Sequence, residues 1–251
     1  MSGQLACAEP EAKLGSCQLL VVESGRAAFR NYMFVVFDPQ SRDAVVIDPG
    51  WDAVFLSNLL QEHGLDCRGL LVTHSHADHI AAASELAQLQ GCPIYLSHIE
   101  AQVSGFRDPA LRLTHGREWV YCGTLACQIL PTPGHTSGSC CFLVGDCLFT
   151  GDTLFMEGVG LCSGPTGSVQ DMFESLQRLK DCVPQDTRVY PGHQYLEPIG
   201  QCFGALKDKN VYLKIGNLKT FAMFCGRSGR NAYRPPPPSS ARELGTCVVQ
   251  L

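Results

Sequence analysis

The sequence of 251 residues is poor in charge, with 17% charged residues and a net charge of −5 at pH 7. It contains no long basic block, which argues against a nucleic-acid backbone as the main partner. No apolar run approaches the ~18 residues of a membrane-spanning helix, so we expect no membrane contact. Residues 1–11 lack the basic start and long apolar run of a secretory signal, so we expect a cytoplasmic protein.

A second absence is that of C-x-x-C spacing among the 14 cysteines. Cys140 and Cys141 are adjacent, and Cys122 and Cys127 are five positions apart. This spacing does not support a cysteine zinc ribbon. Without export, disulfides are not expected, and most of the thiols are predicted to act as small buried hydrophobes.

The chain is long enough to bury a full core in one domain with a small extension. We expect a flexible N-terminus over 1–16, one domain over 17–225 and a disordered proline-rich tail over 226–251. Four consecutive prolines, Pro235 to Pro238, cannot join a helix or a central strand. A ligand for a proline-recognition domain is the alternative interpretation of this tail.

Short strand-like runs alternate with helical patterns in both halves of the domain. Predicted strands cover 18–23, 32–37, 44–47, 69–72, 93–96, 118–121, 125–130, 139–144, 147–150 and 188–190. Predicted helices cover 52–63 with Asp52 as N-cap, about 80–90, 169–182 and part of 202–211. Strands with helices outside both halves imply an α/β (α+β) sandwich of two sheets covered by helices.

Residues 73–79 read Thr-His-Ser-His-Ala-Asp-His and directly follow the apolar run 69–72. His74, His76 and His79, together with Asp78, are ligands suited to zinc, iron or manganese. A buried strand that ends in such a cluster delivers these side chains to one point at the edge of a sheet. The stretch therefore predicts a metal site.

Three further loops, each after a strand-like run, carry a glycine close to a possible ligand. These ligands are His135 in 132–136, Asp152 in 150–153 and His193 in 189–193. Glycine lets the backbone turn sharply and approach a metal closely. The remaining histidines, His63, His98 and His115, have no ligand-like context, and we expect them at the surface or in satisfied polar positions.

The seven donors exceed what one tetrahedral zinc takes and suit two metals that share one carboxylate and one water. We expect two zinc ions per chain, with iron or manganese as alternatives. A pair of cations would lower the pKa of the shared water toward ~7 and provide hydroxide at neutral pH.

The ordered pattern T-H-x-H-x-D-H, P-G-H-T, G-D-T-L-F and P-G-H resembles that of the metallo-β-lactamase superfamily, and most closely its glyoxalase II branch. The resemblance covers about residues 18–195 and implies the αββα sandwich of that family, two mixed sheets flanked by helices. It implies that His74, His76 and His135 bind the first metal, that Asp78, His79 and His193 bind the second, and that Asp152 bridges them. Asp48 matches an aspartate that orients the ligands from behind.

The chain departs from glyoxalase II after the third motif, because Val159 and Leu161 stand where that family has cysteine and arginine. No arginine–lysine pair matches the residues that hold glutathione. The stretch 158–165 and the ending 210–224 resemble instead the zinc hydrolases of bacterial trans-acyltransferase polyketide pathways. That resemblance implies hydrolysis of acyl groups from acyl carrier proteins, in the biosynthesis of compounds such as antibiotics.

A thioester substrate suits both glyoxalase II and the polyketide-pathway hydrolases. A metal can polarise the thioester carbonyl, hydroxide can attack it and a thiolate leaves readily. Asp78 is expected to hold the proton of the hydroxide away from the carbonyl. Acidic carrier proteins would need a basic patch, for which Lys207, Lys209, Lys214 and Lys219 are candidates. The acyl group and the oligomeric state, monomer or homodimer, stay open.

Three rival functions stay open. One is hydroxyacylglutathione hydrolysis; another is a persulfide dioxygenase with one iron at His74, His135 and Asp152; a third is a binding module without catalysis. A β-lactamase is disfavoured because the bridging position is Asp152 and not cysteine.

Overall fold

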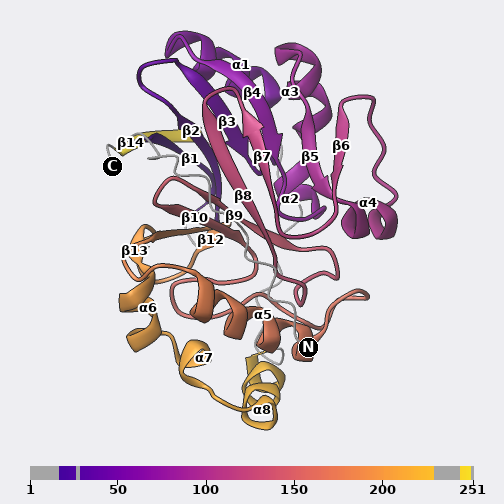
Figure 1. The fold of residues 1–251 in the computed structure, drawn as a ribbon, viewed down its shortest axis with the longest axis vertical. Helices are drawn as coiled ribbons and strands as arrows, with labels where there is room; N and C mark the ends of the chain where they lie inside the picture. Colours follow the sequence, from indigo (N-terminus) through magenta and orange to yellow (C-terminus); the bar gives the residue numbers. More distant parts are fainter. Residues whose placement is uncertain (1–16, 27–28, 229–243, 250–251) are drawn as a thin grey trace, which may run out of the picture.

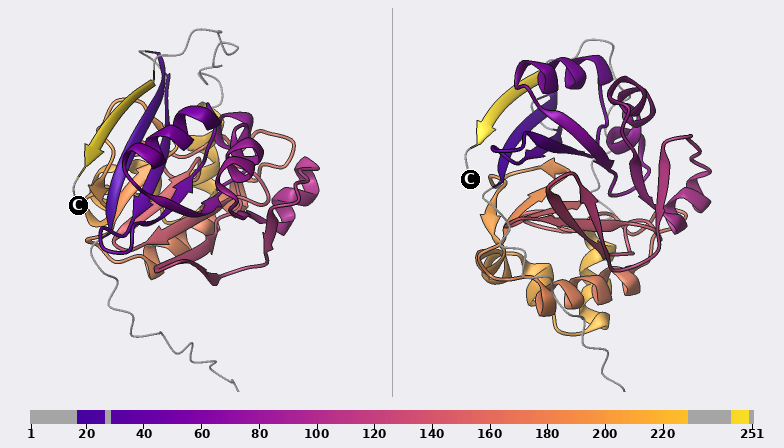
Figure 2. Two further views of the ribbon diagram at one scale, coloured as in Figure 1. Left: turned by 90° about the horizontal axis from the view of Figure 1, so that it is seen from above. Right: turned by 45° about the horizontal axis from the view of Figure 1, so that its top comes forward.

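A computed structural model describes residues 17–26, 29–228 and 244–249. Two β-sheets face each other in the middle, and helices cover the outer face of each sheet (Figures 1 and 2). This arrangement is the αββα sandwich that the sequence predicted. Among the described residues, no helix combines the length and the apolar character needed to cross a membrane.

The first sheet has the strand order β14-β1-β2-β3-β4-β5-β6, and β12 pairs with β2 off this path. Its strands are β1 (Gln18–Arg26), β2 (Phe29–Phe37), β3 (Asp43–Ile47), β4 (Asp66–Leu71), β5 (Ile94–Ser97), β6 (Leu111–Thr114), β12 (His193–Gln194) and β14 (Leu244–Val249). The pairs from β14 to β3 are antiparallel and those from β3 to β6 are parallel, so the sheet is mixed.

The second sheet has the order β13-β11-β10-β9-β8-β7. Its strands are β7 (Glu118–Cys122), β8 (Leu125–Pro131), β9 (Cys140–Val144), β10 (Cys147–Gly151), β11 (Arg188–Pro191) and β13 (Gln201–Cys202). Only the β10–β11 pair of this sheet is parallel among the described strands. Both hairpins predicted in this half, β7–β8 and β9–β10, are confirmed.

Helices of the first half are α1 (Ala53–Glu62), α2 (Ala77–Ile80), α3 (Ala83–Gln90) and α4 (His98–Ser104). Helices of the second half are α5 (Val169–Cys182), α6 (Phe203–Lys209), α7 (Val211–Lys214) and α8 (Leu218–Ser228). Asp52 is confirmed as the N-cap of α1, since its carboxylate accepts a hydrogen bond of 2.9 Å from the Phe55 amide.

Alternation along the strands divides the core into layers. On β2, Met33 and Val35 face the helices α1 and α3, whereas Phe34 and Val36 face the other sheet. Side chains alternate between the two faces of a strand, so a strand with helices on one side and a sheet on the other is apolar on both faces. This explains the near-continuous apolar runs in the sequence.

The expectation that most cysteines are buried is confirmed for eight of the twelve cysteines from Cys17 to Cys225. The eight are Cys17, Cys67, Cys92, Cys122, Cys127, Cys140, Cys141 and Cys147. Five of them, Cys17, Cys122, Cys127, Cys140 and Cys147, pack in the layer between the two sheets. All twelve are free thiols.

Two expectations need correction. The single helix predicted over about 80–90 is divided into α2 and α3, because the amide of Ala82 leaves the helical pattern and donates to the carbonyl of Pro49. The tail predicted to be disordered over 226–251 contains β14, which pairs with β1, and α8 extends to Ser228. The proline run and residues 1–16 lie outside the described residues.

Candidate metal centre

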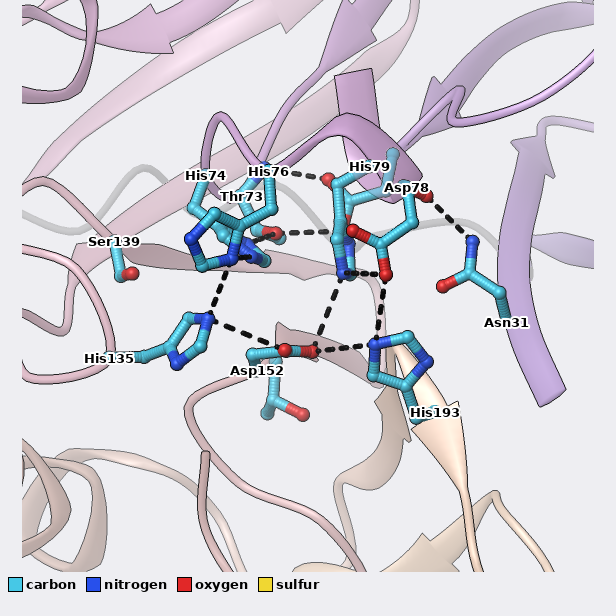
Figure 3. Close-up of polar contacts among 12 residues, drawn as sticks. Asn31, Thr73, His74, His76, Asp78, His79, His135, Ser139, Asp152 and His193 are labelled. Carbon is cyan, nitrogen blue, oxygen red and sulfur yellow. Dashed lines mark hydrogen bonds and ion pairs between the residues drawn. The ribbon is translucent and has the colours of Figure 1, made fainter. Parts of the chain in front are cut away.

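The seven predicted donors come together where strands of the two sheets end. β4 leads into the loop that carries His74 to His79, and Asp152 directly follows β10. His135 lies between β8 and β9, and His193 begins β12 one residue after the end of β11. The loops that follow β4, β10 and β11 meet, since Asp152 contacts both His79 and His193 (Figure 3).

The first donor set is formed by His74, His76 and His135. The Nδ1 atom of His76 lies 3.0 Å from Nε2 of His74 and 3.0 Å from Nε2 of His135. Asp152 completes the set, with Oδ2 at 3.4 Å from Nε2 of His135. The four ligand atoms all lie within 4.8 Å of one another.

The second donor set is formed by Asp78, His79 and His193. Oδ2 of Asp78 lies 3.4 Å from Nε2 of His193 and 3.7 Å from Nε2 of His79. Oδ1 of Asp152 lies 3.3 Å from the same His193 atom and 3.5 Å from the same His79 atom. Asp152 therefore turns one oxygen to each set, as Figure 3 shows.

The donor set fits divalent cations. A tetrahedral zinc site with zinc–nitrogen bonds of about 2.0–2.1 Å has ligand–ligand edges of about 3.3–3.4 Å. The five donor–donor separations given above for the two sets, 3.0 to 3.7 Å, lie around that value. Nε2 of His79 and Oδ1 of Asp152 are buried and form no hydrogen bond, only the ion-pair contacts of 3.3 to 3.7 Å given above, and a cation would satisfy both atoms.

Burial and neighbouring charge set the protonation of the donors. Burial lowers the pKa of His74 well below its usual value, and the nearby His79 adds to this effect. His74 is therefore a neutral imidazole, the form that binds metals. Burial raises the pKa of Asp152, but His193 and His79 outweigh it and hold that pKa well below its usual range.

His79 has the opposite shift. Burial lowers its pKa, but the carboxylates of Asp48 and Asp152 outweigh burial and raise the pKa well above its usual value. The space beside its Nε2 thus favours positive charge. A metal cation can take the place of the proton there, between the same carboxylates.

Asp48 contacts the residue before His74 and the ring of His79. Its carboxylate accepts hydrogen bonds of 2.7 Å from both the amide and the hydroxyl of Thr73. It also contacts Nδ1 of His79 at 2.9 Å, which turns Nε2 of that ring toward the second set. The Asp48 backbone lies in the left-handed region, at a φ of 49°.

The glycine before His193 permits a close approach. A Cβ atom on Gly192 would lie 2.4 Å from Cε1 of His79 and 3.1 Å from Oδ1 of Asp152. Only glycine fits here without moving a donor. The sequence predicted that the glycine of this loop lets the backbone come close to the site, and the structure shows which donor atoms the backbone approaches.

Two residues that support the site were missed. Asn31 on β2 donates a hydrogen bond of 2.6 Å to the carbonyl of Asp78, and Glu100 on α4 contacts the loops of both Ser75 and Thr136. No ligand-like motif surrounds either residue. His63, His98 and His115 lie outside both donor sets, and the rings of His98 and His115 stack on each other with centroids 4.7 Å apart.

Comparison with known proteins agrees with the fold. A curated relative, the "Probable polyketide biosynthesis zinc-dependent hydrolase BaeB" of Bacillus velezensis, is 38% identical over 201 residues, which cover 80% of this chain and 89% of that protein. A "Hydroxyacylglutathione hydrolase" of Shewanella halifaxensis is 35% identical, with 84% and 77% covered. The crystal structure of ETHE1 from Myxococcus xanthus is 30% identical, with a TM-score of 0.72 over 82% of this chain and 88% of that one.

The family model described as "Metallo-beta-lactamase superfamily" matches residues 25–193. That range begins in β1 and ends at His193, so it contains all seven donors. With its two mixed sheets, its flanking helices and this match over most of its length, the chain belongs to the metallo-beta-lactamase superfamily.

Proposed function

We propose that the protein is a dinuclear zinc hydrolase that cleaves thioesters, with an acylated acyl carrier protein as its substrate. The observation that carries the proposal is the position of Asp152, whose two oxygens face two separate donor sets. His74, His76 and His135 hold one zinc, and Asp78, His79 and His193 hold the other. Zinc ions bound there supply Lewis acidity toward a carbonyl oxygen and lower the pKa of a water molecule.

Asp78 is suited to hold the proton of the attacking water. Its side chain is 27% exposed, whereas that of Asp152 is 12% exposed, so Asp78 lies more open to substrate. Burial raises the pKa of Asp78, but the hydrogen bond with His193 outweighs it, and the pKa lies below its usual value. Asp78 is therefore a carboxylate at neutral pH and can accept a hydrogen bond from the nucleophile.

The surroundings of the centre favour an apolar acyl group over glutathione. Leu161 stands where glyoxalase II has arginine and is 42% exposed, while its carbonyl accepts a hydrogen bond of 2.7 Å from His135. On the side of His193, Tyr195 is 46% exposed and Leu196 is 85% exposed. Exposed apolar side chains on both sides of the donors suit an acyl chain better than a charged tripeptide.

The partner is supported by the name of the BaeB relative, which refers to polyketide biosynthesis, and by exposed basic side chains on α6, α7 and α8. Lys209, Lys214 and Lys219 are exposed on α6, α7 and α8. Asn210, between α6 and α7, donates hydrogen bonds to the carbonyls of Phe155 and Gly158, in the loop after Asp152. The junction of α6 and α7 thus adjoins the loop after Asp152, and these helices can receive an acidic carrier protein.

Metal analysis tests the centre. The purified protein is expected to contain two zinc ions per chain and to lose hydrolysis when a chelator removes them. A single iron with oxygen consumption on a persulfide would contradict the proposal.

A substrate competition tests the partner. Acyl carrier protein thioesters should be cleaved with a higher kcat/KM than the same acyl group on glutathione. The triple variant Lys209→Glu, Lys214→Glu and Lys219→Glu should raise KM for the carrier protein substrate by about tenfold or more. A small soluble thioester is the control and should be cleaved at the wild-type rate.

Hydroxyacylglutathione hydrolysis is the second candidate, because a relative with that name is 35% identical. Preference for the glutathione thioester, together with no effect of the triple variant, would favour it.

A further inference from the structure

Glu100 is a buried acid in the first turn of α4, with 1% of its surface exposed. Its Oε1 accepts hydrogen bonds from the amide of Ser75 at 2.9 Å and from the hydroxyl of Ser75 at 2.5 Å. Its Oε2 accepts hydrogen bonds from the hydroxyl of Thr136 at 2.7 Å and from the amide of Gly138 at 3.2 Å. Each oxygen thus receives one backbone amide and one hydroxyl.

The donors to Glu100 belong to two loops that carry the first ligand set. Ser75 lies between His74 and His76, and Thr136 directly follows His135. One carboxylate therefore ties together the loops of all three histidines. The contact requires a close approach, because a Cβ atom on Gly138 would lie 2.3 Å from the backbone nitrogen of Glu100.

Asp48 and Glu100 act on opposite sides of His74. Asp48 binds Thr73, the residue before His74, and Glu100 binds Ser75, the residue after it. Within the described residues, no lysine, arginine or histidine forms an ion pair with Glu100. A buried carboxylate without a cationic partner is costly, and nearby divalent cations would offset that cost.

We infer that Glu100 is a positioning residue for the first ligand set: it holds the two loops together and supplies negative charge that favours a divalent cation between His74, His76 and His135. The inference rests on the proposed metal centre. It predicts that loss of this charge weakens metal binding while the metal-free fold is retained.

The experiment compares zinc binding in the wild type, Glu100→Gln, Thr136→Val and the control Glu85→Gln, an exposed acid on α3. Each full-length protein is freed of metal and titrated with zinc against a chromophoric chelator, and melting temperatures are measured with and without zinc. Glu100→Gln should raise the dissociation constant of one zinc equivalent by about 10- to 100-fold. Relative to the wild type, its melting temperature should fall more in the presence of zinc than in its absence. The reason is that the stabilisation of the fold by zinc depends on the zinc dissociation constant.

Thr136→Val removes one of the four hydrogen bonds and should raise the same dissociation constant by a smaller factor. If Glu100→Gln does not fold, Thr136→Val carries the test. Zinc constants equal to those of Glu85→Gln, or equal losses of melting temperature with and without zinc, would overturn the inference. A wild type that binds no zinc would overturn the proposed function itself, and this inference with it.

Discussion

The two oxygens of Asp152 have different neighbours, and this asymmetry distinguishes it from the other donors. Oδ2 is nearest His135 of the first set, and Oδ1 is nearest His193 and His79 of the second. Each histidine belongs to one set only. A change at Asp152 therefore affects both sets together, whereas a change at a histidine affects one set directly.

We predict that Asp152→Ala abolishes zinc retention and hydrolysis together, because neither set keeps its shared carboxylate. Zinc per chain, measured by mass spectrometry of the metals, and the rate on a thioester check this outcome. Asp186→Ala, at an exposed position, is the control and should keep both. Full activity in Asp152→Ala would refute the bridging role.

Gly192→Ala should also disrupt the centre, for a steric reason. The added methyl would lie 2.4 Å from Cε1 of His79, a fully buried ring that has no room to move. Overpacking of this kind costs about 1–3 kcal/mol of the free energy of unfolding and displaces a donor. Urea unfolding and zinc content measure both effects.

Gly216→Ala is the matched control, since a Cβ there meets nothing within 4 Å. Equal behaviour of the two variants would contradict the steric explanation.

The residues of the site that could be predicted are those whose motif lies within one short stretch of sequence. His74, His76, Asp78 and His79 fall within one short segment, so spacing alone indicated them. Glu100 acts across 25 positions to Ser75 and 36 to Thr136, and its partners are set by the packing of α4 against the loops. No pattern in the sequence encodes such a contact.

At the scale of the elements, α1 depends on its first turn. Asp52 has a φ of 46°, a left-handed conformation that asparagine and aspartate tolerate better than alanine does. Asp52→Ala should lower the free energy of unfolding by about 1 kcal/mol or more, through the lost cap and this conformation.

Asp52→Asn retains both the cap and the conformation, so its urea unfolding midpoint should stay near that of the wild type. A loss of similar size in both variants would show that the charge of Asp52, and not its capping bond, stabilises α1.

Helices and strands were predictable where a local sequence signal marks their start or end. They were not predictable where tertiary contacts determine their bounds or pairing. The cap at Asp52 and the whole of α5 follow from local patterns. The division between α2 and α3 depends on the carbonyl of Pro49, which is remote in sequence. The pairing of β14 with β1 joins the two ends of the described chain, and a short strand after a proline run gives little sign of a partner.

At the scale of the whole molecule, buried thiols make stability depend on alkaline pH. Burial, with a contribution from Asp38, raises the pKa of Cys17 to about 11, and burial raises the pKa of Cys141 to about 12. Unfolded thiols titrate near ~8.5, so above that pH the unfolded state loses protons that the folded state keeps.

The free energy of unfolding should therefore be constant with respect to these thiols below ~8.5 and fall at higher pH, by up to about 1.4 kcal/mol per pH unit for each one. Urea unfolding between pH 7.5 and 10 measures the slope. Cys17→Ala should reduce it, and the same slope in that variant would contradict the assignment.

The donors are spread along the chain as well as across the two sheets. His74 belongs to the first half, Asp152 follows β10 of the second sheet, and His193 lies where the chain returns to pair with β2. During synthesis on a ribosome the second donor set therefore stays incomplete until residue 193 has emerged. Metal binding at the second set would then require that the two halves have already docked. A chain that ends before His193 could not form the complete centre.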